Sequence, residues 1–344
     1  MISTNKIIHR QLTKILKKNK KAFIIGEGVN DPKGIFGTTT GLNKKFKNQV
    51  LESPISENGV TGMCIGAAKM GMKPILIHQR VDFMFYSMDQ IINNLAKSYF
   101  ITDGKYNVPL VIRAIIGRGW GQGPMHSQSF ETIFAKIPGI EIFIPVFPHE
   151  FYHVYNYAAK SKNPMIIFEH RWLHNIKGSK INVMKNIKIP SKIISGKDIT
   201  IVASGYNVLE VLKLKKILKK HNIKIDFFNL MCLQPLSLNV ILKSIKKTKN
   251  VMIIENDHTV FGFGSEILAK VIEQGINLEN KPIRMGTPFF PCPMSKEHVA
   301  KYYINSREIF KNILKILNLD SKLLNQVKKN KLIDVPDENF IGPF

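Results

Sequence analysis

Three side chains suited to ligand binding and proton transfer follow separate strand-like segments in the first part of the chain. Glu57 is the only acid in the small and apolar run 54–59, Phe83 follows an apolar run that ends near residue 78, and His126 follows a glycine-rich loop. In an α/β sheet such ends converge on one edge, where ligands bind. The spacing therefore predicts one binding site built from an acid, an aromatic ring and a histidine.

Each of these residues also has an ordinary structural explanation. An acid such as Glu57 is favoured at the start of a helix by the helix dipole, a residue such as Phe83 often belongs to the core, and most histidines satisfy local hydrogen bonds. The loop 117–123 could be an inert turn. Because it contains Trp120 and leads directly into His126, we favour an active-site wall.

Several common site motifs are missing from the sequence. After Gly26-x-Gly28 the third glycine position holds Asp31, and after Gly262-x-Gly264 it holds an isoleucine, so a Rossmann dinucleotide site is not expected. No P-loop and no metal-spaced cluster of Cys and His occurs. His170 and His174 are four residues apart without a third ligand, which favours structural or surface roles.

The composition indicates a soluble protein of ordinary hydrophobicity and strong basicity. Fifty basic against 25 acidic residues give a formal net charge of +25. The lysines are scattered over predicted helix faces without interleaved aromatic residues, so we expect no nucleic-acid binding and favour attraction to an acidic partner protein. Three distant cysteines form no CxxC pair, and no apolar run is as long as a membrane span. These features predict a cytoplasmic protein without a membrane segment.

The elements that must position the site residues alternate between apolar strands and helices. This alternation predicts a parallel sheet covered on both faces. The expected strands are 22–25, 74–77, 108–116, 140–146 and 165–168, and the expected helices are 4–19, 60–72, 87–100 and 149–160. The helix 60–72 is rich in Gly and Ala, which predicts close packing at the heart of the fold.

A second, smaller alternation follows a polar, basic segment. It has expected strands 199–203, 223–228 and 250–254 and an expected helix 208–220. The predicted fold class is therefore α/β, with two domains built on parallel or mixed sheets. The expected boundaries are 1–175 for the first domain, 176–197 for a linker, 198–325 for the second domain and 326–344 for a tail.

Taken in order, the motifs resemble the β subunit of the thiamine diphosphate-dependent 2-oxo acid dehydrogenases, the family of the pyruvate, branched-chain and acetoin enzymes. The resemblance covers nearly the whole chain and implies a transketolase-like pyrimidine-binding domain followed by a transketolase C-terminal domain. The motifs are Gly26-Glu27, Pro54-Ile55-Ser56-Glu57, Asp82-Phe83, Asp89-Gln90, His126-Ser127-Gln128, Phe168-Glu169-His170, Leu233-Gln234-Pro235-Leu236 and Gly262-Phe263-Gly264-Ser265-Glu266.

The resemblance also implies roles for individual residues. Glu57 matches the acid that hydrogen-bonds the aminopyrimidine ring of the cofactor, and such a carboxyl group should be buried. Phe83 matches the ring that stacks on the aminopyrimidine, and His126 matches a catalytic histidine near the substrate channel. Glu27 and Gln79 are further expected contacts of the cofactor.

Partners and ions follow from the same resemblance. The chain lacks Gly-Asp-Gly, so a separate α subunit is expected to hold the diphosphate and magnesium in an α2β2 assembly. A lipoyl acyltransferase and a small 2-oxo acid are the further expected partners. The potassium site of the family falls on residues that offer mainly backbone carbonyls, namely Leu110, Ala158, Ala159, Ser161 and Asn163.

Two other functions stay open on the sequence alone. The chain could be half of a split transketolase-like enzyme that transfers a two-carbon or acyl unit, because Glu57 would serve there as well. It could also be a non-catalytic interaction subunit. Arg80 and Arg118 depart from the family pattern and could recognise a more acidic substrate or form salt bridges to the α subunit.

Overall fold

The computed structural model describes residues 1–119, 121–178 and 183–328, which form two compact units. The first unit contains residues 1–118, 125–178 and 183–187 of this part, and the second contains residues 119, 121–124 and 188–328. The units therefore divide inside the segment 176–197 that the sequence analysis predicts as a linker. The tail 326–344 lies almost wholly outside the described residues.

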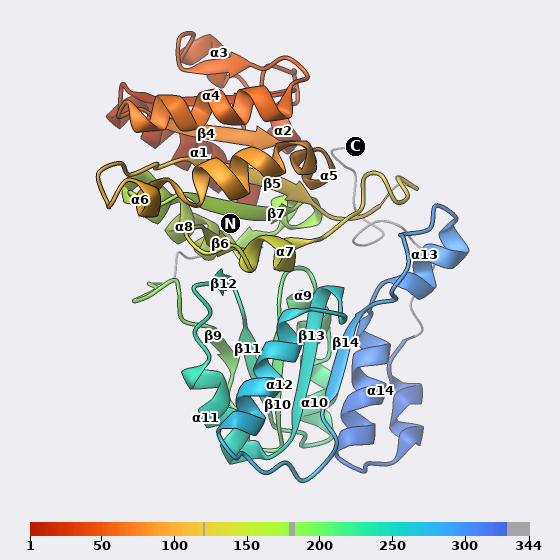
Figure 1. The fold of residues 1–344 in the computed structure, drawn as a ribbon. Coiled ribbons are helices and arrows are strands. Elements are labelled where there is room, and N and C mark those ends of the chain that lie inside the picture. The colour runs from red at the N-terminus through yellow and green to blue at the C-terminus, as the bar shows by residue number, and fades with distance from the viewer. Residues whose placement is uncertain (120, 179–182, 329–344) are drawn as a thin grey trace. The chain divides into compact units, whose positions relative to one another are not determined.

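The first unit is built on a parallel sheet whose strands follow the order β6-β7-β5-β4-β2-β3. Figure 1 labels β4, β5, β6 and β7 of this sheet. Apolar runs of this kind are typical of strands covered by helices on both faces, and every residue of β2, β4, β5, β6 and β7 is buried. The strands are β2 Ala22–Gly26, β3 Val50–Glu52, β4 Lys73–His78, β5 Val111–Ile116, β6 Glu141–Phe143 and β7 Met165–His170. The predicted α/β class is confirmed.

Helices connect these strands. The longest are α1 Thr4–Lys18, α4 Glu57–Lys69 and α8 Pro148–Lys160, and α1 packs against α8. Shorter ones are α2 Gly34–Gly37, α3 Leu42–Lys45, α5 Val81–Met84, η1 Phe85–Ser87, α6 Ser98–Ile101, α7 Glu131–Ala135 and η3 Arg171–Asn175. A small antiparallel ribbon joins β1 Ile2–Ser3 to β8 Lys177–Gly178.

Two helices of the first unit differ from the prediction. The expected helix 87–100 is interrupted, because residues Gln90–Leu95 form the π-helix η2 and a new helix begins at Ser98. Helix α4 is present but not buried all round, since Met63 is 50% exposed and the following Met70 is 82% exposed. Small side chains predicted close packing there, yet one face of α4 meets no other part of the described chain.

The second unit has the strand order β14-β13-β10-β11-β9. Strands β10 Ile199–Ala203, β11 Ile225–Asn229, β13 Val251–His258 and β14 Ile283–Thr287 are parallel, whereas β9 Ser191–Ile194 runs antiparallel to β11. Strand β9 lies in the predicted linker, which is therefore only partly irregular. The expected helix 208–220 is divided at Leu214 into α9 Asn207–Lys213 and α10 Lys215–Lys220.

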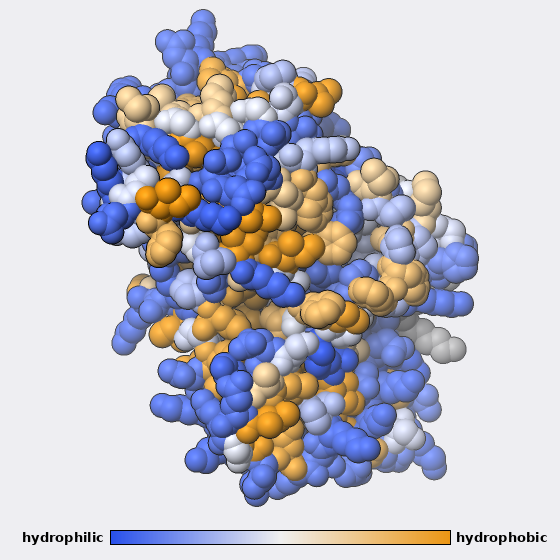
Figure 2. Space-filling model, viewed as in Figure 1, coloured by the Kyte–Doolittle hydropathy of each residue, from blue (hydrophilic) through white to orange (hydrophobic). Residues whose placement is uncertain are grey.

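The remaining elements of the second unit are α11 Asn239–Thr248, α12 Phe263–Glu273, α13 Lys296–Tyr302, α14 Ser306–Ile316, β12 Cys232–Gln234 and η4 Ser321–Gln326. Figure 2 shows hydrophilic side chains over much of one face, with hydrophobic side chains gathered in places. In the described ranges no helix combines the length and the apolar character needed to cross a membrane.

Candidate active site

A pocket in the first unit lies at the carboxyl ends of β2 and β4, beside the start of α4. It encloses about 300 Å³, counting the part open to solvent. Ligands of parallel α/β sheets bind at this edge. The lining residues are Glu27, Ser53, Pro54, Glu57, Val60, Leu76, Ile77, His78, Gln79 and Phe83. The pocket therefore brings together four of the five residues predicted to catalyse or to bind the cofactor.

Glu57 is the first residue of α4, as the sequence predicts, and its side chain lines the pocket. Its backbone carbonyl accepts a 2.7 Å hydrogen bond from the Thr61 hydroxyl, which also lies 2.9 Å from the hydroxyl of Ser87. These bonds tie the first turn of α4 to η1. Glu57 is half-buried in this chain by itself, and Ser56 and Asn58 on either side of it are exposed.

Glu27 follows the last residue of β2. Gly26 precedes it where β2 passes close to β4, since a Cβ atom there would lie 2.6 Å from the carbonyl oxygen of Ile77. Burial raises the pKa of Glu27, and the neighbouring charges of Glu57 and Glu52 raise it further. Hence Glu27 carries a proton more readily than an exposed glutamate.

Glu52, which the sequence analysis does not single out, shapes the loop after β2. Its carboxylate accepts hydrogen bonds from the backbone amides of Gly28 and Asn30, the latter at 2.9 Å. Both of its oxygens are therefore engaged by the backbone. An acid at the end of a short strand, two residues before a proline, gives no signal in the sequence for this role.

His126 lies beside Phe83, with ring centroids 5.6 Å apart in an edge-on arrangement. Their two segments are joined a second time, because the side-chain amide of Gln128 donates a 2.6 Å hydrogen bond to Asp82. Burial raises the pKa of Asp82, although this hydrogen bond acts in the opposite direction. The buried Nδ1 atom of His126 has no hydrogen-bond partner within the described part of the chain. His126 thus lies next to Phe83 of the pocket, and one of its ring nitrogens has no partner within the described residues.

His78 and Gln79 form the end of the pocket at β4. Burial lowers the pKa of His78 to about 4, so its imidazole is neutral at pH 7. Gln79 lies where the resemblance places a cofactor contact. His78 is not among the predicted site residues, although a polar residue at the end of an otherwise apolar strand is a signal for it.

The glycine-rich loop 117–123 was expected to form an active-site wall, yet none of its described residues lines this pocket. The guanidinium of Arg118 stacks over the ring of Trp172, 4.5 Å from its centroid, and the Arg118 carbonyl accepts a 2.8 Å hydrogen bond from Arg171. Trp120 lies outside the described residues. Arg118 therefore has contacts within the first unit that account for its position.

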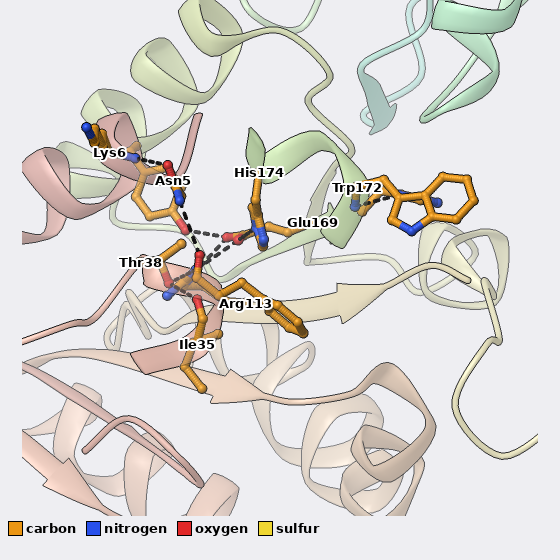
Figure 3. A network of polar contacts seen from close by, with 11 residues as sticks. Asn5, Lys6, Ile35, Thr38, Arg113, Glu169, Trp172 and His174 are labelled. Carbon is orange, nitrogen blue, oxygen red and sulfur yellow. Dashed lines mark hydrogen bonds and ion pairs between the residues drawn. The ribbon is translucent and has the colours of Figure 1, made fainter. Parts of the chain in front are cut away.

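A second polar group is buried in the sheet itself (Figure 3). Arg113 of β5 donates two hydrogen bonds of 2.8 Å to Glu169 of β7, and a third of 3.0 Å to the hydroxyl of Thr38. Glu169 also contacts Nε2 of His174 at 3.0 Å and accepts a short hydrogen bond from Tyr155.

The other histidine of the pair, His170, accepts a hydrogen bond from the backbone of Trp172. Both histidines therefore have structural roles, as the sequence analysis favours.

Comparison with known proteins agrees with this architecture. The pattern of the transketolase pyrimidine binding domain matches residues 1–176, and that of the transketolase C-terminal domain matches residues 191–309. The chain belongs to the transketolase-like family of 2-oxo acid dehydrogenase β subunits. The pocket lies within the region that matches the pyrimidine binding domain.

Individual members of this family are similar over most of their length. The mitochondrial pyruvate dehydrogenase E1 component subunit beta of Saccharomyces cerevisiae is 28% identical, over 93% of this chain and 90% of that protein. The acetoin:2,6-dichlorophenolindophenol oxidoreductase subunit beta of Cupriavidus necator is 31% identical, over 76% of this chain and 78% of that protein. A solved structure titled split gene transketolase, inactive beta4 tetramer, shares the fold with a TM-score of 0.76 at 18% identity, covering 92% of this chain and 99% of that one.

Two of the five residues implied for potassium in this family already accept hydrogen bonds through their backbone carbonyls. The carbonyl of Ser161 accepts a 2.7 Å hydrogen bond from the ammonium group of Lys73, and the carbonyl of Leu110 accepts one of 3.0 Å from the amide of Met165. Burial lowers the pKa of Lys73 to about 8, so the ammonium is still charged at pH 7. A second cation at Ser161 would meet this charge at close range.

Proposed function

We propose that this chain is the β subunit of a thiamine diphosphate-dependent 2-oxo acid dehydrogenase, which decarboxylates a pyruvate-like 2-oxo acid and transfers the acyl group to a lipoyl acceptor. The observation that carries the proposal is the pocket in which Glu57, Glu27 and Phe83 come together at the edge of the sheet. The yeast relative, a subunit of pyruvate dehydrogenase, supports a 2-oxo acid as the substrate.

The pocket residues fit an aminopyrimidine ring. Such a ring needs flat apolar surface against its faces and hydrogen-bonding groups at its edge. Phe83 offers an aromatic face, Val60 and Ile77 offer apolar walls, and the carboxyl groups of Glu27 and Glu57 offer the polar edge. A protonated carboxyl group can donate a hydrogen bond, whereas an ionised one only accepts. The raised pKa of Glu27 favours its protonated form, so the two acids together offer a donor and acceptors.

Each residue then has a defined task. When bound, thiamine diphosphate supplies an electron sink for the decarboxylation of the 2-oxo acid. Glu57 holds a proton at a ring nitrogen of the aminopyrimidine, and Phe83 stacks on the ring. His126, beside Phe83 and with its Nδ1 atom unpartnered in the described chain, holds or moves a proton during acyl transfer. Gln79 contacts the cofactor at the end of β4.

A separate α subunit completes the site. The sequence has no Gly-Asp-Gly, so the diphosphate and its magnesium are held by that partner in an α2β2 assembly. Apolar side chains at the surface of the first unit support such a contact, since Tyr86 is 72%, Phe100 88% and Ile101 68% exposed. The partner also supplies the burial that Glu57 lacks in this chain.

Arg80 departs from the family pattern and is the residue beside the pocket that could alter substrate specificity. Its guanidinium carbon lies 5.9 Å from the centre of the Phe36 ring, and no acid in the described residues forms an ion pair with it. It stands directly after Gln79 of the pocket. The two roles left open for it are contact with an acidic substrate and a salt bridge to the α subunit.

The test is to purify the tagged chain from its own cells with the proteins that accompany it. The complex is then supplied with thiamine diphosphate, magnesium and a panel of 2-oxo acids, and released carbon dioxide and acylated lipoyl acceptor are measured. The proposal predicts a stoichiometric partner that carries Gly-Asp-Gly, and carbon dioxide release from at least one 2-oxo acid.

Two results would contradict the proposal in different ways. Transfer of a two-carbon unit between sugars, without an acid substrate, would identify half of a split transketolase-like enzyme. A chain that is purified alone, binds no thiamine diphosphate and releases no carbon dioxide would identify a non-catalytic interaction subunit.

A further inference from the structure

Lys73 is a buried cation without an anion. It begins β4, at the opposite end of that strand from the pocket, and is only 6% exposed. Its ammonium group donates a 2.7 Å hydrogen bond to the backbone carbonyl of Ser161, and no carboxylate within the described residues forms an ion pair with it. Buried lysines are rare unless a specific partner compensates their charge, so the environment of this ammonium needs an explanation.

The end of helix α8 supplies that environment. Ser161 is the residue that caps α8, and the last carbonyls of a helix lack donors within the helix. Their aligned dipoles also give the end of the helix a partial negative charge. The Lys73 ammonium therefore contacts one of the backbone carbonyls at the end of this helix, and no carboxylate of the described residues pairs with it.

The same carbonyls form most of the potassium site that the family resemblance implies. Ala158 and Ala159 belong to the last turn of α8, and Ser161 follows it. Asn163 is also engaged, since its backbone amide donates a 3.0 Å hydrogen bond to the Ser161 hydroxyl and its side chain donates to Glu141 at 3.2 Å. The segment after α8 is thus closed by contacts within the chain.

We propose that the Lys73 ammonium is a built-in monovalent cation, which takes the place of potassium among the carbonyls at the end of α8. An alkylammonium group and a potassium ion carry the same charge, and each is satisfied by carbonyl oxygens. A covalently attached cation links the start of β4 to the end of α8 at any salt concentration. This inference does not rest on the proposed function.

The first test compares thermal unfolding of the purified protein in potassium, sodium and tetramethylammonium chloride at equal ionic strength. Wild type is expected to have the same midpoint in all three salts. Lys73→Ala, which leaves space for an ion, is expected to unfold roughly 3 to 6 °C lower in sodium and to recover at least half of that loss in potassium. Lys73→Met, which fills the space without a charge, is expected to lose stability equally in every salt.

Lys69→Ala is the matched control, because Lys69 is exposed at the end of α4 and makes no contact of this kind. It is expected to keep the wild-type midpoint in each salt. A midpoint of the wild type that rises specifically with potassium would overturn the proposal, as would a Lys73→Ala variant that potassium does not rescue.

A direct measurement keeps the proposal testable if Lys73→Ala does not fold. Crystals of the wild-type protein are soaked in rubidium chloride, since rubidium replaces potassium and is located by its anomalous scattering. The expected result is no rubidium peak within contact of the Ser161 carbonyl. A strong peak there would show that an ion binds beside Lys73 and that the lysine does not replace it.

Discussion

Two acids of the first unit, Glu169 within the sheet and Glu27 at its edge, have pKa values shifted in opposite directions. Glu169 on β7 is fully buried, yet two bonds from Arg113, one from His174 and one from Tyr155 surround its carboxylate. Burial alone would raise the pKa of Glu169, but the charge and hydrogen bonds of Arg113 hold it well below its usual range. For Glu27 in the pocket, burial and the charges of Glu57 and Glu52 all raise the pKa.

This difference in pKa distinguishes an acid that stabilises the fold from acids that can still bind a ligand. The chain supplies every donor that Glu169 needs, so this carboxylate has no capacity left for a substrate. Within the described residues no group donates a hydrogen bond to the carboxylates of Glu27 and Glu57, although Glu57 begins a helix at the sheet edge. Unsatisfied acids in a cleft are candidates for a functional site, whereas the saturated one is structural.

The largest effect is expected from breaking the saturated group. Arg113→Met leaves Glu169 buried without its main partner, which should lower the free energy of unfolding by about 3 to 5 kcal/mol. Urea unfolding followed by circular dichroism measures it. Arg10→Met is the matched control, because Arg10 is exposed on α1. Equal losses in the two variants would show that the Arg113–Glu169 pair contributes nothing beyond an exposed arginine.

Glu255 of β13 in the second unit is an intermediate case. Its side chain is fully buried and one oxygen meets Arg284 at 3.0 Å, while the other has no partner in the described chain. Burial raises its pKa to about 7, although Arg284 acts in the opposite direction. Because the folded-state pKa exceeds the unfolded value, its stabilising contribution is complete below about pH 4 and is lost as the pH rises through 7.

For Glu255 the free energy of unfolding is therefore expected to fall by up to roughly 3 kcal/mol between pH 5 and pH 8. Glu255→Gln should remove this part of the pH dependence. Urea unfolding of both proteins across that range measures the difference. An unchanged slope in the variant would mean that Arg284 already keeps Glu255 charged in the folded state.

The smallest effect is expected at Glu27, which is only half-buried. Glu27→Gln removes a repulsive charge beside Glu57 and Glu52, so the variant should be more stable than wild type at pH 7 by less than about 1 kcal/mol. As the pKa of Glu27 is raised in the folded state, this advantage should vanish below about pH 4, where both states hold the proton. A destabilised variant at pH 7 would show that the Glu27 carboxylate makes a stabilising contact in the free protein.

The sheet and the pocket could be predicted because their signals are local. Buried strands such as β4 contain continuous apolar runs, here residues 74–77. The lone acid Glu57 indicates the start of a helix at the sheet edge. The π-helix Gln90–Leu95 could not be predicted, because its side chains follow an ordinary helical pattern. Strand β9 was missed because its segment is polar and half-exposed, and only its pairing with β11 orders it.

The charged contacts were missed for a different reason. Arg113 and Glu169 are 56 residues apart, and Lys73 and Ser161 are 88 residues apart, so neither pairing has a local pattern. A weak signal does exist for the first pair, since each residue interrupts an otherwise apolar strand. Lys73 is the first residue of such a strand, and in the sequence it resembles any of the surface lysines of this basic chain.

The most direct test of the central claim is the carbon dioxide release rate of the complex carrying Glu57→Gln. Loss of the proton held at the aminopyrimidine should lower this rate at least about 100-fold, as expected for an essential acid–base group. Glu297→Gln is the matched control, because Glu297 stands exposed in the first turn of α13. The account predicts full activity in the control and loss in Glu57→Gln with the complex intact. A Glu57→Gln complex that keeps the wild-type rate would contradict it.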